Sequence, residues 1–308
     1  MKSLIRFKKT KILRDVSFSL GAIFALAITT HAQNLYVSAN VLGGNHEVFE
    51  FTPSGVQSVY ASGLNNPRGL AFDSIGNLYA TTAHDAGPIE IGRVLKYDLR
   101  NHVSTFGSAS KFFFEGLARD IAGNVYVLAN DDTSPTEAST IFKFTSSGDR
   151  IVFGSLPGQG WGLAFDSAGN LYAAQGPVDL GGDPTIYEFA PDGTRTIFAG
   201  PDQFATGEYP VGLAFDRSGN LFVSIETFGD PGTDSIVYFT PMGVKSTFAT
   251  GLTFPRGLAF DSLGNLFVAE ANPPPDGDIL EFAPDGSELP VFASGFGRPE
   301  FLTFGPPR

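Results

Sequence analysis

Large apolar residues recur at short spacing, without a helical stripe, along residues 69–80, which read GLAFDSIGNLYA. Two apolar runs flank an Asp-x-x-Gly turn, so this stretch predicts a β-hairpin. The stretch returns four times, beginning at Gly116, Gly162, Gly212 and Gly257. The intervals are 47, 46, 50 and 45 residues, and a period of this length is typical of propeller or solenoid repeats.

A second pair of predicted strands follows each hairpin. In residues 185–199 the runs TIYEF and TIFA flank the turn Pro191-Asp192-Gly193. Four antiparallel strands in a unit of about 46 residues form one propeller blade. The aspartates that open the first turn of each unit are interpreted as structural because of this turn context: Asp73, Asp120, Asp166, Asp216 and Asp261.

The two ends of the chain complete the repeat count. Residues 34–60 contain three strand patterns with no first strand before them, and residues 299–304 contain a first strand with no hairpin after it. Five full units and this shared unit predict an all-β, six-bladed β-propeller with four-stranded antiparallel blades. The last blade is closed by the N-terminal strands plus a C-terminal strand, which leaves no free edge in the ring.

The repeated phrase P-x-G-L-A-F-D-S-x-G-N-L-Y-V-A resembles the NHL-repeat and gluconolactonase-like (senescence marker protein) six-bladed propellers over residues 34–304. Neither the Trp-Asp dipeptides of WD repeats nor the glycine pair of kelch repeats recurs. The resemblance implies a fold that lactonases, lyases, receptor modules and RNA-binding modules share, so it indicates architecture rather than activity.

The first 32 residues have the composition of a secretory signal peptide. Six basic residues lie within residues 1–14, and an apolar run from Val16 to Ile28 ends in Thr30-His31-Ala32. This pattern predicts a signal peptide over residues 1–32, cleaved near Ala32, and a single domain over residues 33–308 that is secreted or periplasmic. The apolar run is too short for a stable anchor and no second one follows, so we expect no membrane anchor.

Charge and cysteine content narrow the range of partners. The chain has no cysteine, so its stability must come from a large core and from strand pairing. Residues 33–308 contain 14 basic and 31 acidic residues, a formal charge of −17. Such a surface repels nucleic acid and anionic lipid. We expect a monomer whose partner is a small molecule or a protein, and no nucleic acid.

The candidate site lies at one end of the predicted channel. In propellers the first strand of each blade lines the channel, and it begins on the face that carries the loops between strands two and three. The residue before each Gly-Leu pair, or its counterpart in the last blade, is expected there: Arg68, Glu115, Trp161, Val211, Arg256 and Glu300. The long loops on this face vary, as binding loops do: residues 39–46, 81–92, 130–139, 175–184, 226–234 and 270–278.

Gluconolactonase-like members place divalent-cation ligands mainly at the position before Gly-Leu. Two arginines occupy that ring in this chain, and guanidinium groups repel a cation. In blade order Arg256, Glu300, Arg68 and Glu115 alternate in charge, which predicts an ion-pair network. Either the charges only satisfy one another, or a ligand with a carboxylate or sugar hydroxyls is held by the arginines and stacks on Trp161.

Alternative chemistry rests on the loops. Their carboxylates could bind Ca²⁺, with Asp131, Glu226 and Glu270 as the candidate ligands, but no EF-hand or nonapeptide spacing is present, and we expect no cofactor. His46, or His84 beside Asp85, is the candidate general base. No nucleophile motif is found. The sequence therefore favours a non-catalytic binding module, with a metal-dependent lactonase or lyase as the alternative.

Overall fold

The computed structural model describes residues 33–41, 46–83, 91–131, 138–176, 183–227, 231–272 and 277–307. The chain divides into two compact units, Met1–Thr30 and His31–Arg308, and all described residues belong to the second. Among these residues, no helix is long and apolar enough to cross a membrane.

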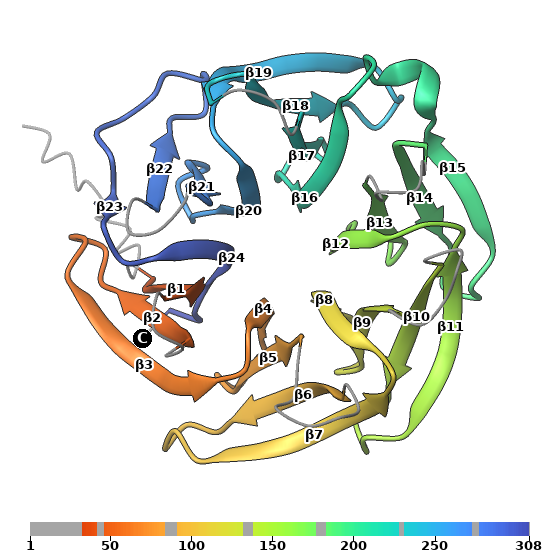
Figure 1. The fold of residues 1–308 in the computed structure, drawn as a ribbon, viewed down its shortest axis with the longest axis vertical. Helices are drawn as coiled ribbons and strands as arrows, with labels where there is room; N and C mark the ends of the chain where they lie inside the picture. The colour runs from red at the N-terminus through yellow and green to blue at the C-terminus, as the bar shows by residue number, and fades with distance from the viewer. Residues whose placement is uncertain are drawn as a thin grey trace, which may run out of the picture. The chain divides into compact units, whose positions relative to one another are not determined.

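Six four-stranded antiparallel sheets surround a central channel, which confirms the predicted six-bladed propeller (Figure 1). Blade 1 contains β24 (Arg298–Phe304), β1 (Leu35–Asn40), β2 (His46–Phe51) and β3 (Gln57–Leu64). Blade 2 contains β4 (Pro67–Phe72), β5 (Leu78–Thr82), β6 (Ile91–Tyr97) and β7 (Val103–Ser110). Blade 3 contains β8 (Phe113–Arg119), β9 (Val125–Asn130), β10 (Ser139–Phe144) and β11 (Arg150–Leu156).

The second half of the ring repeats this order. Blade 4 contains β12 (Gly160–Phe165), β13 (Leu171–Gln175), β14 (Thr185–Phe189) and β15 (Arg195–Ala199). A short 3-10 helix, η1 (Pro201–Gln203), leads into the next blade. Blade 5 contains β16 (Tyr209–Phe215), β17 (Leu221–Glu226), β18 (Asp234–Phe239) and β19 (Lys245–Leu252). Blade 6 contains β20 (Pro255–Phe260), β21 (Leu266–Glu270), β22 (Asp278–Phe282) and β23 (Ala293–Ser294).

The ring closes as the sequence predicts. Strand β24 pairs antiparallel with β1, with Leu35 opposite Phe304 and Val37 opposite Leu302. Blade 6 differs from the expected pattern, because its fourth strand shortens to Ala293–Ser294. Pro290 interrupts that strand since proline has no N–H to donate to the ladder.

The Asp-x-x-Gly turns have the structural role expected for them. Asp73 Oδ1 accepts hydrogen bonds from the backbone N–H groups of Ile75 and Asn77 at 3.2 and 2.7 Å. Its Oδ2 accepts the Asn77 side-chain amide at 2.6 Å, and Gly76 has φ +98°. The other four turns bind the matching asparagine in the same way, so these carboxylates are already occupied.

The repeated Gly-Leu pairs build the narrow part of the channel. A Cβ on Gly69 would lie 2.4 Å from Leu117 N, and one on Gly212 would lie 1.9 Å from Arg256 O, so glycine lets neighbouring first strands approach closely. The leucines after these glycines, together with Leu302 after Phe301 in blade 1, line a space of about 160 Å³. These six residues are called the leucine neck: Leu70, Leu117, Leu163, Leu213, Leu258 and Leu302.

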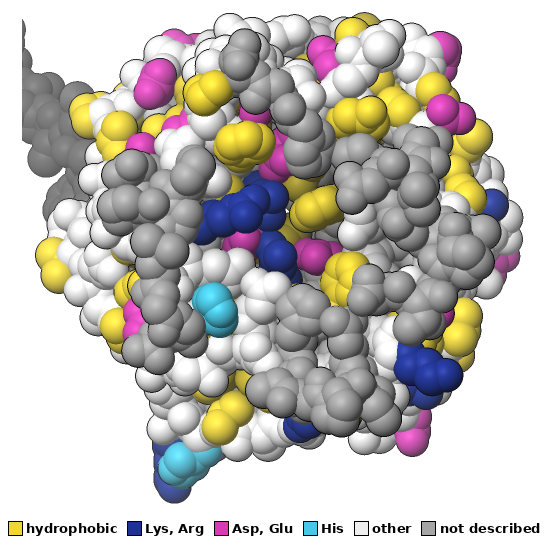
Figure 2. Space-filling view, in the orientation of Figure 1, with side chains coloured by type: hydrophobic (Ala, Val, Ile, Leu, Met, Phe, Trp, Pro, Cys, Tyr) yellow, Lys and Arg dark blue, Asp and Glu magenta, His cyan; other side chains and the backbone are white. Residues whose placement is uncertain are grey.

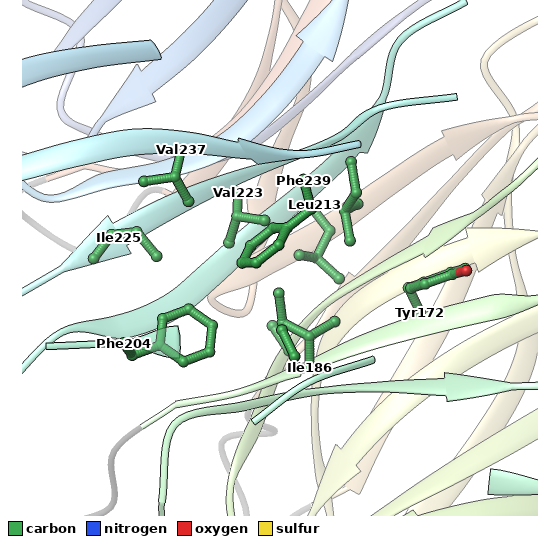
Figure 3. Close-up of a cluster of buried hydrophobic side chains, with 11 residues drawn as sticks. Tyr172, Ile186, Phe204, Leu213, Val223, Ile225, Val237 and Phe239 are labelled. Carbon is green, nitrogen blue, oxygen red and sulfur yellow. The ribbon is translucent and has the colours of Figure 1, made fainter. Parts of the chain in front are cut away.

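Aromatic rings pack in the seams between blades. Phe222 of β17 meets Phe248 of its own blade and Phe260 of blade 6 edge to face, with both centroids 5.0 Å away. Figure 3 shows the apolar cluster between blades 4 and 5, including Tyr172, Leu213 and Phe239. Such seams hold each blade to the next and make the channel a rigid frame.

Candidate functional site at the channel mouth

Four of the six residues predicted for the channel mouth form one ion-pair network. Glu300 of β24 pairs with Arg256 of β20 and with Arg68 of β4, whose Nη1 lies 2.5 Å from Glu300 Oε2. Arg68 Nε lies 3.5 Å from Glu115 Oε2 of β8. The charges therefore alternate around neighbouring blades in the predicted order. Figure 2 shows basic and acidic side chains gathered in the hollowed centre of this face.

Hydroxyl groups on neighbouring blades hold the backbone of three mouth residues in place. The hydroxyl group of Thr81, in β5, donates to the carbonyl oxygen of Glu115 at 2.7 Å. Ser38 donates to Arg68 O at 2.7 Å, and Ser224 donates to Arg256 O at 2.8 Å. Three seams of the ring thus carry a hydroxyl bond from one blade to the mouth residue of the next.

Glu300 is the centre of the network and is fully buried. Besides Arg68 and Arg256, it accepts the Asn40 amide on Oε1 at 2.9 Å and lies 3.6 Å from Arg298 Nε. Burial would raise the pKa of Glu300, but the guanidinium groups of Arg256, Arg68 and Arg298 outweigh it and lower that pKa. Glu300 therefore stays ionised at neutral pH.

Arg256 links this network to the opposite side of the mouth. Its Nε donates to Glu226 Oε1 at 3.1 Å, and its guanidinium carbon lies 5.3 Å from the centre of the Trp161 ring. Burial acts to lower the pKa of Arg256, but Glu300 and Glu226 raise it overall. The guanidinium covers one face of the indole by a cation–π contact. A ligand cannot stack on that face unless Arg256 moves.

Glu226 is as buried as Glu300 but has fewer partners. Its Oε1 contacts Arg256, and its Oε2 has no hydrogen-bond partner among the described residues. Burial raises the pKa of Glu226; Arg256 opposes this shift, while Glu300 and Asp234 add to it. Glu226 and Glu300 are thus two fully buried glutamates of the mouth with opposite pKa shifts.

Arg298 is the accessible guanidinium of the mouth. Its side chain is 37% exposed, against 13% for Arg68 and 6% for Arg256. Burial and the neighbouring Arg256 and Arg68 lower the pKa of Arg298, while Glu300 and Glu226 oppose this shift. Burial and Arg68 likewise lower the pKa of His46. In the described part of the mouth, Arg298 is therefore a solvent-exposed cation close to two other arginines, and His46 is a neutral imidazole.

The remaining candidates have other surroundings. Val211 is buried. Glu270 accepts the backbone N–H of Thr253, in the link between β19 and β20, at 2.6 Å, and Asp131 follows β9 in blade 3. No group of three or more His, Asp or Glu side chains that could hold a metal ion occurs in the described ranges, so Asp131, Glu226 and Glu270 are not brought together there. His84 and Asp85 lie outside the described residues.

Sequence reasoning missed Arg298 and Asn40 and did not pair Glu226 with Arg256. Arg298 precedes Glu300 by two residues in the same strand, so an inspection of the residues just upstream would have found it. Asn40 and Glu226 both stand six residues into the second-strand pattern of their blades. Aligning the second strands as well as the first would have placed both at the mouth.

Comparison with known proteins supports the fold. No family model matches the chain, and no curated protein sequence matches it. Among solved structures, TolB from Acinetobacter baumannii has a TM-score of 0.66 at 12% identity, covering 89% of this chain and 67% of its own. A gluconolactonase from Xanthomonas campestris has a TM-score of 0.60 at 17% identity, covering 88% and 94%.

A third solved structure belongs to the same group of folds. Regucalcin from Agrobacterium tumefaciens, described as a calcium-binding protein, has a TM-score of 0.53 at 16% identity, covering 74% of each chain. What these proteins share with this chain is the six-bladed fold. The resemblance to gluconolactonase-like propellers holds at that level, while membership of the NHL-repeat or senescence marker protein family stays a prediction from the repeated phrase.

Proposed function

We propose that this chain is a non-catalytic binding module whose channel mouth takes up a small molecule that carries a carboxylate. The observation that carries the proposal is the convergence of three guanidinium groups, from Arg68, Arg256 and Arg298, on the single carboxylate of Glu300. A second anion beside Arg298 would relieve the repulsion among these cations. Arginine suits this role because its planar fork binds a carboxylate through two parallel hydrogen bonds.

The balance of charge at the mouth supports an anionic ligand. Glu115 and Glu226 add two carboxylates to Glu300, but Glu115 pairs with Arg68 and Glu226 pairs with Arg256. Glu226 is also fully buried, whereas the Arg298 side chain is 37% exposed. The part of the network that a ligand meets first is therefore positive.

The neck below the mouth supports binding from one side only. The space among the leucines is about 160 Å³ and is lined mainly by apolar side chains. An ionised group would lose its hydration there without gaining a partner. The ligand would enter and leave by the mouth, with its carboxylate near Arg298 and the rest of the molecule toward the loops.

The same residues argue against the metal-dependent alternative. Arg68 and Arg256 stand at positions where the resemblance implies cation ligands, and their charges disfavour a divalent ion. A non-catalytic role also agrees with the absence of a nucleophile motif from the sequence. Export through the signal peptide over residues 1–32 belongs to the proposal and rests on the sequence pattern.

Isothermal titration calorimetry of residues 33–308 with D-glucuronate and D-glucose tests the proposal, because the two sugars differ in the carboxylate. We expect binding of D-glucuronate, none of D-glucose, and a loss of about tenfold or more in Arg298→Ala, since a hydrogen bond to a charged group is removed. Acetate, succinate and phenylacetate extend the series to other carboxylates.

Arg217→Ala is the matched control, because Arg217 is exposed in the turn between β16 and β17 at the opposite end of those strands. Its affinity should equal that of the wild type. Equal binding of D-glucose and D-glucuronate, or unchanged binding in Arg298→Ala, would contradict the proposed role of the mouth. Calcium-dependent hydrolysis of a lactone would favour the enzyme alternative.

A further inference from the structure

We propose that the channel mouth binds its anion together with a proton, and that Glu226 accepts this proton. The inference rests on the proposed function, since it assumes that an anion binds beside Arg298. It adds a second bound species and names the residue that holds it.

The position of Glu226 in the repeat shows that blade packing does not require a carboxylate there. Every blade has a residue at this place, six residues into its second-strand pattern, and in the other five blades that residue is uncharged: Asn40, Ala83, Asn130, Gly176 and Ala271. Asn40 also points to the mouth, where its amide binds Glu300. Only blade 5 has an ionisable residue at this position of its second strand, so the charge of Glu226 is not part of the repeat.

The surroundings of Glu226 stabilise its charge incompletely. Arg256 of β20 contacts Oε1 at 3.1 Å, but this guanidinium also serves Glu300. The other charged groups that act on Glu226 are Glu300 and Arg298 of β24 and Asp234 of β18, two of which are carboxylates. Glu226 is 0% exposed, and its Oε2 has no hydrogen-bond partner among the described residues. A buried carboxylate with one satisfied oxygen is costly to keep ionised.

An anion at the mouth makes this situation worse. Arg256 and Arg298 are the two cations that stabilise ionised Glu226. A bound anion pairs with Arg298 and partly neutralises the positive potential of Arg256. The Glu226 carboxylate then takes one proton from solvent and becomes a neutral carboxylic acid, and its new O–H supplies a hydrogen-bond donor. Glu300 does not take this proton, because three guanidinium groups lower its pKa.

The sign of the coupling follows from linkage. Burial already raises the pKa of Glu226, and a bound anion raises it further. At a pH between the pKa values of the free and bound states, binding takes up a proton. Affinity is highest below the pKa of the free state and falls as pH rises through that of the bound state, by at most about tenfold per pH unit.

His46 is the competing proton acceptor, and the experiment must separate the two. Burial and Arg68 lower the pKa of His46, so a nearby anion would also favour its protonation. Calorimetry of D-glucuronate binding from pH 5 to 8, in buffers of different protonation enthalpy, measures the protons taken up per ligand. Between the pKa values of the free and bound states the wild type should take up protons, at most one per ligand, His46→Gln should do the same, and Glu226→Gln should take up none.

Glu115→Gln is the matched control, since it also removes a carboxylate from the mouth beside Arg68. Both glutamine variants should bind D-glucuronate more tightly than the wild type at pH 8, because each removes a negative charge. Only Glu226→Gln should lose the proton uptake and the pH dependence of affinity. Uptake that persists in Glu226→Gln, or disappears in His46→Gln, would overturn the assignment.

Two further outcomes separate this inference from the proposed function. Binding of D-glucuronate by the wild type without proton uptake at any pH overturns the inference and leaves the binding function intact. No binding of any carboxylate at any pH overturns the binding function and the inference with it. A carbon-13 NMR titration of the wild type gives an independent measurement: the pKa of the Glu226 carboxyl should rise when D-glucuronate is added, and an unchanged pKa refutes the coupling.

Discussion

The mouth and the neck of the channel are built by the same six strands, only two residues apart in each, yet they differ in every chemical respect. All six blades place a leucine at the neck. At the mouth the corresponding residues are two arginines, two glutamates, a tryptophan and a valine. The neck is formed by the same side chain from every blade, whereas each mouth residue contacts particular side chains on other blades.

This difference shows which contacts another side chain of similar volume could replace. A leucine in the neck contacts apolar atoms that any side chain of similar volume would also contact. Glu300 contacts Arg68, Arg256 and Arg298, and each of these groups depends on its charge. Removing one charged side chain from the mouth leaves its partners buried without their opposite charge. Removing one leucine side chain from the neck leaves a cavity.

Removing the centre of the mouth should have the largest effect on the free energy of unfolding. Glu300→Ala leaves Arg68 and Arg256 buried with less compensation, and we expect a loss of about 3–5 kcal/mol, measured by urea unfolding. Glu300→Gln keeps the shape and should cost less.

Glu208→Ala is the control for that experiment. Glu208 pairs with Lys245 at 3.2 Å, but both side chains are 26% exposed, so we expect a loss of about 1 kcal/mol or less. Similar losses for the two glutamates would show that the mouth network is no more cooperative than a surface ion pair.

Shortening one leucine of the neck should have a smaller effect. Leu302 is 6% exposed, and Leu302→Ala should lower the free energy of unfolding by about 2–3 kcal/mol through lost apolar contact and a remaining cavity. Thermal unfolding followed by circular dichroism measures the change. Leu263→Ala in an exposed turn should change stability by less than about 0.5 kcal/mol, and anion affinity should be unaffected if mouth and neck are independent.

The smallest effect is expected in a seam where one blade binds the backbone of a mouth residue in the next. The buried Thr81 hydroxyl group donates to Glu115 O at 2.7 Å, and Thr81→Val should cost about 1 kcal/mol in stability by removing this hydrogen bond. Thr196→Val on the exposed strand β15 is the control and should be nearly neutral. A change in D-glucuronate affinity in Thr81→Val alone would show that this seam sets the geometry of the mouth.

Much of the fold was predictable because it rests on local chemistry that repeats. Asp73 and Gly76 form the same turn in five units, so turn residues and spacing predicted the hairpins. The alternation of Arg256, Glu300, Arg68 and Glu115 was also predictable, because blade order follows chain order. The short strand β23 was not expected, although Pro290 marked the interruption.

The sequence by itself determined the six blades, the closure of the ring by β24 and β1, and the residues at the channel mouth, because a regular repeat turns chain position into position in space. Only the tertiary structure decided how those residues interact. Arg298 and Glu226 reach the mouth from different blades, Arg256 covers Trp161, and two equally buried glutamates acquire opposite pKa shifts. The physical reason is that a pKa depends on burial and on how many charges lie within a few ångströms, and side chains from separate blades supply both.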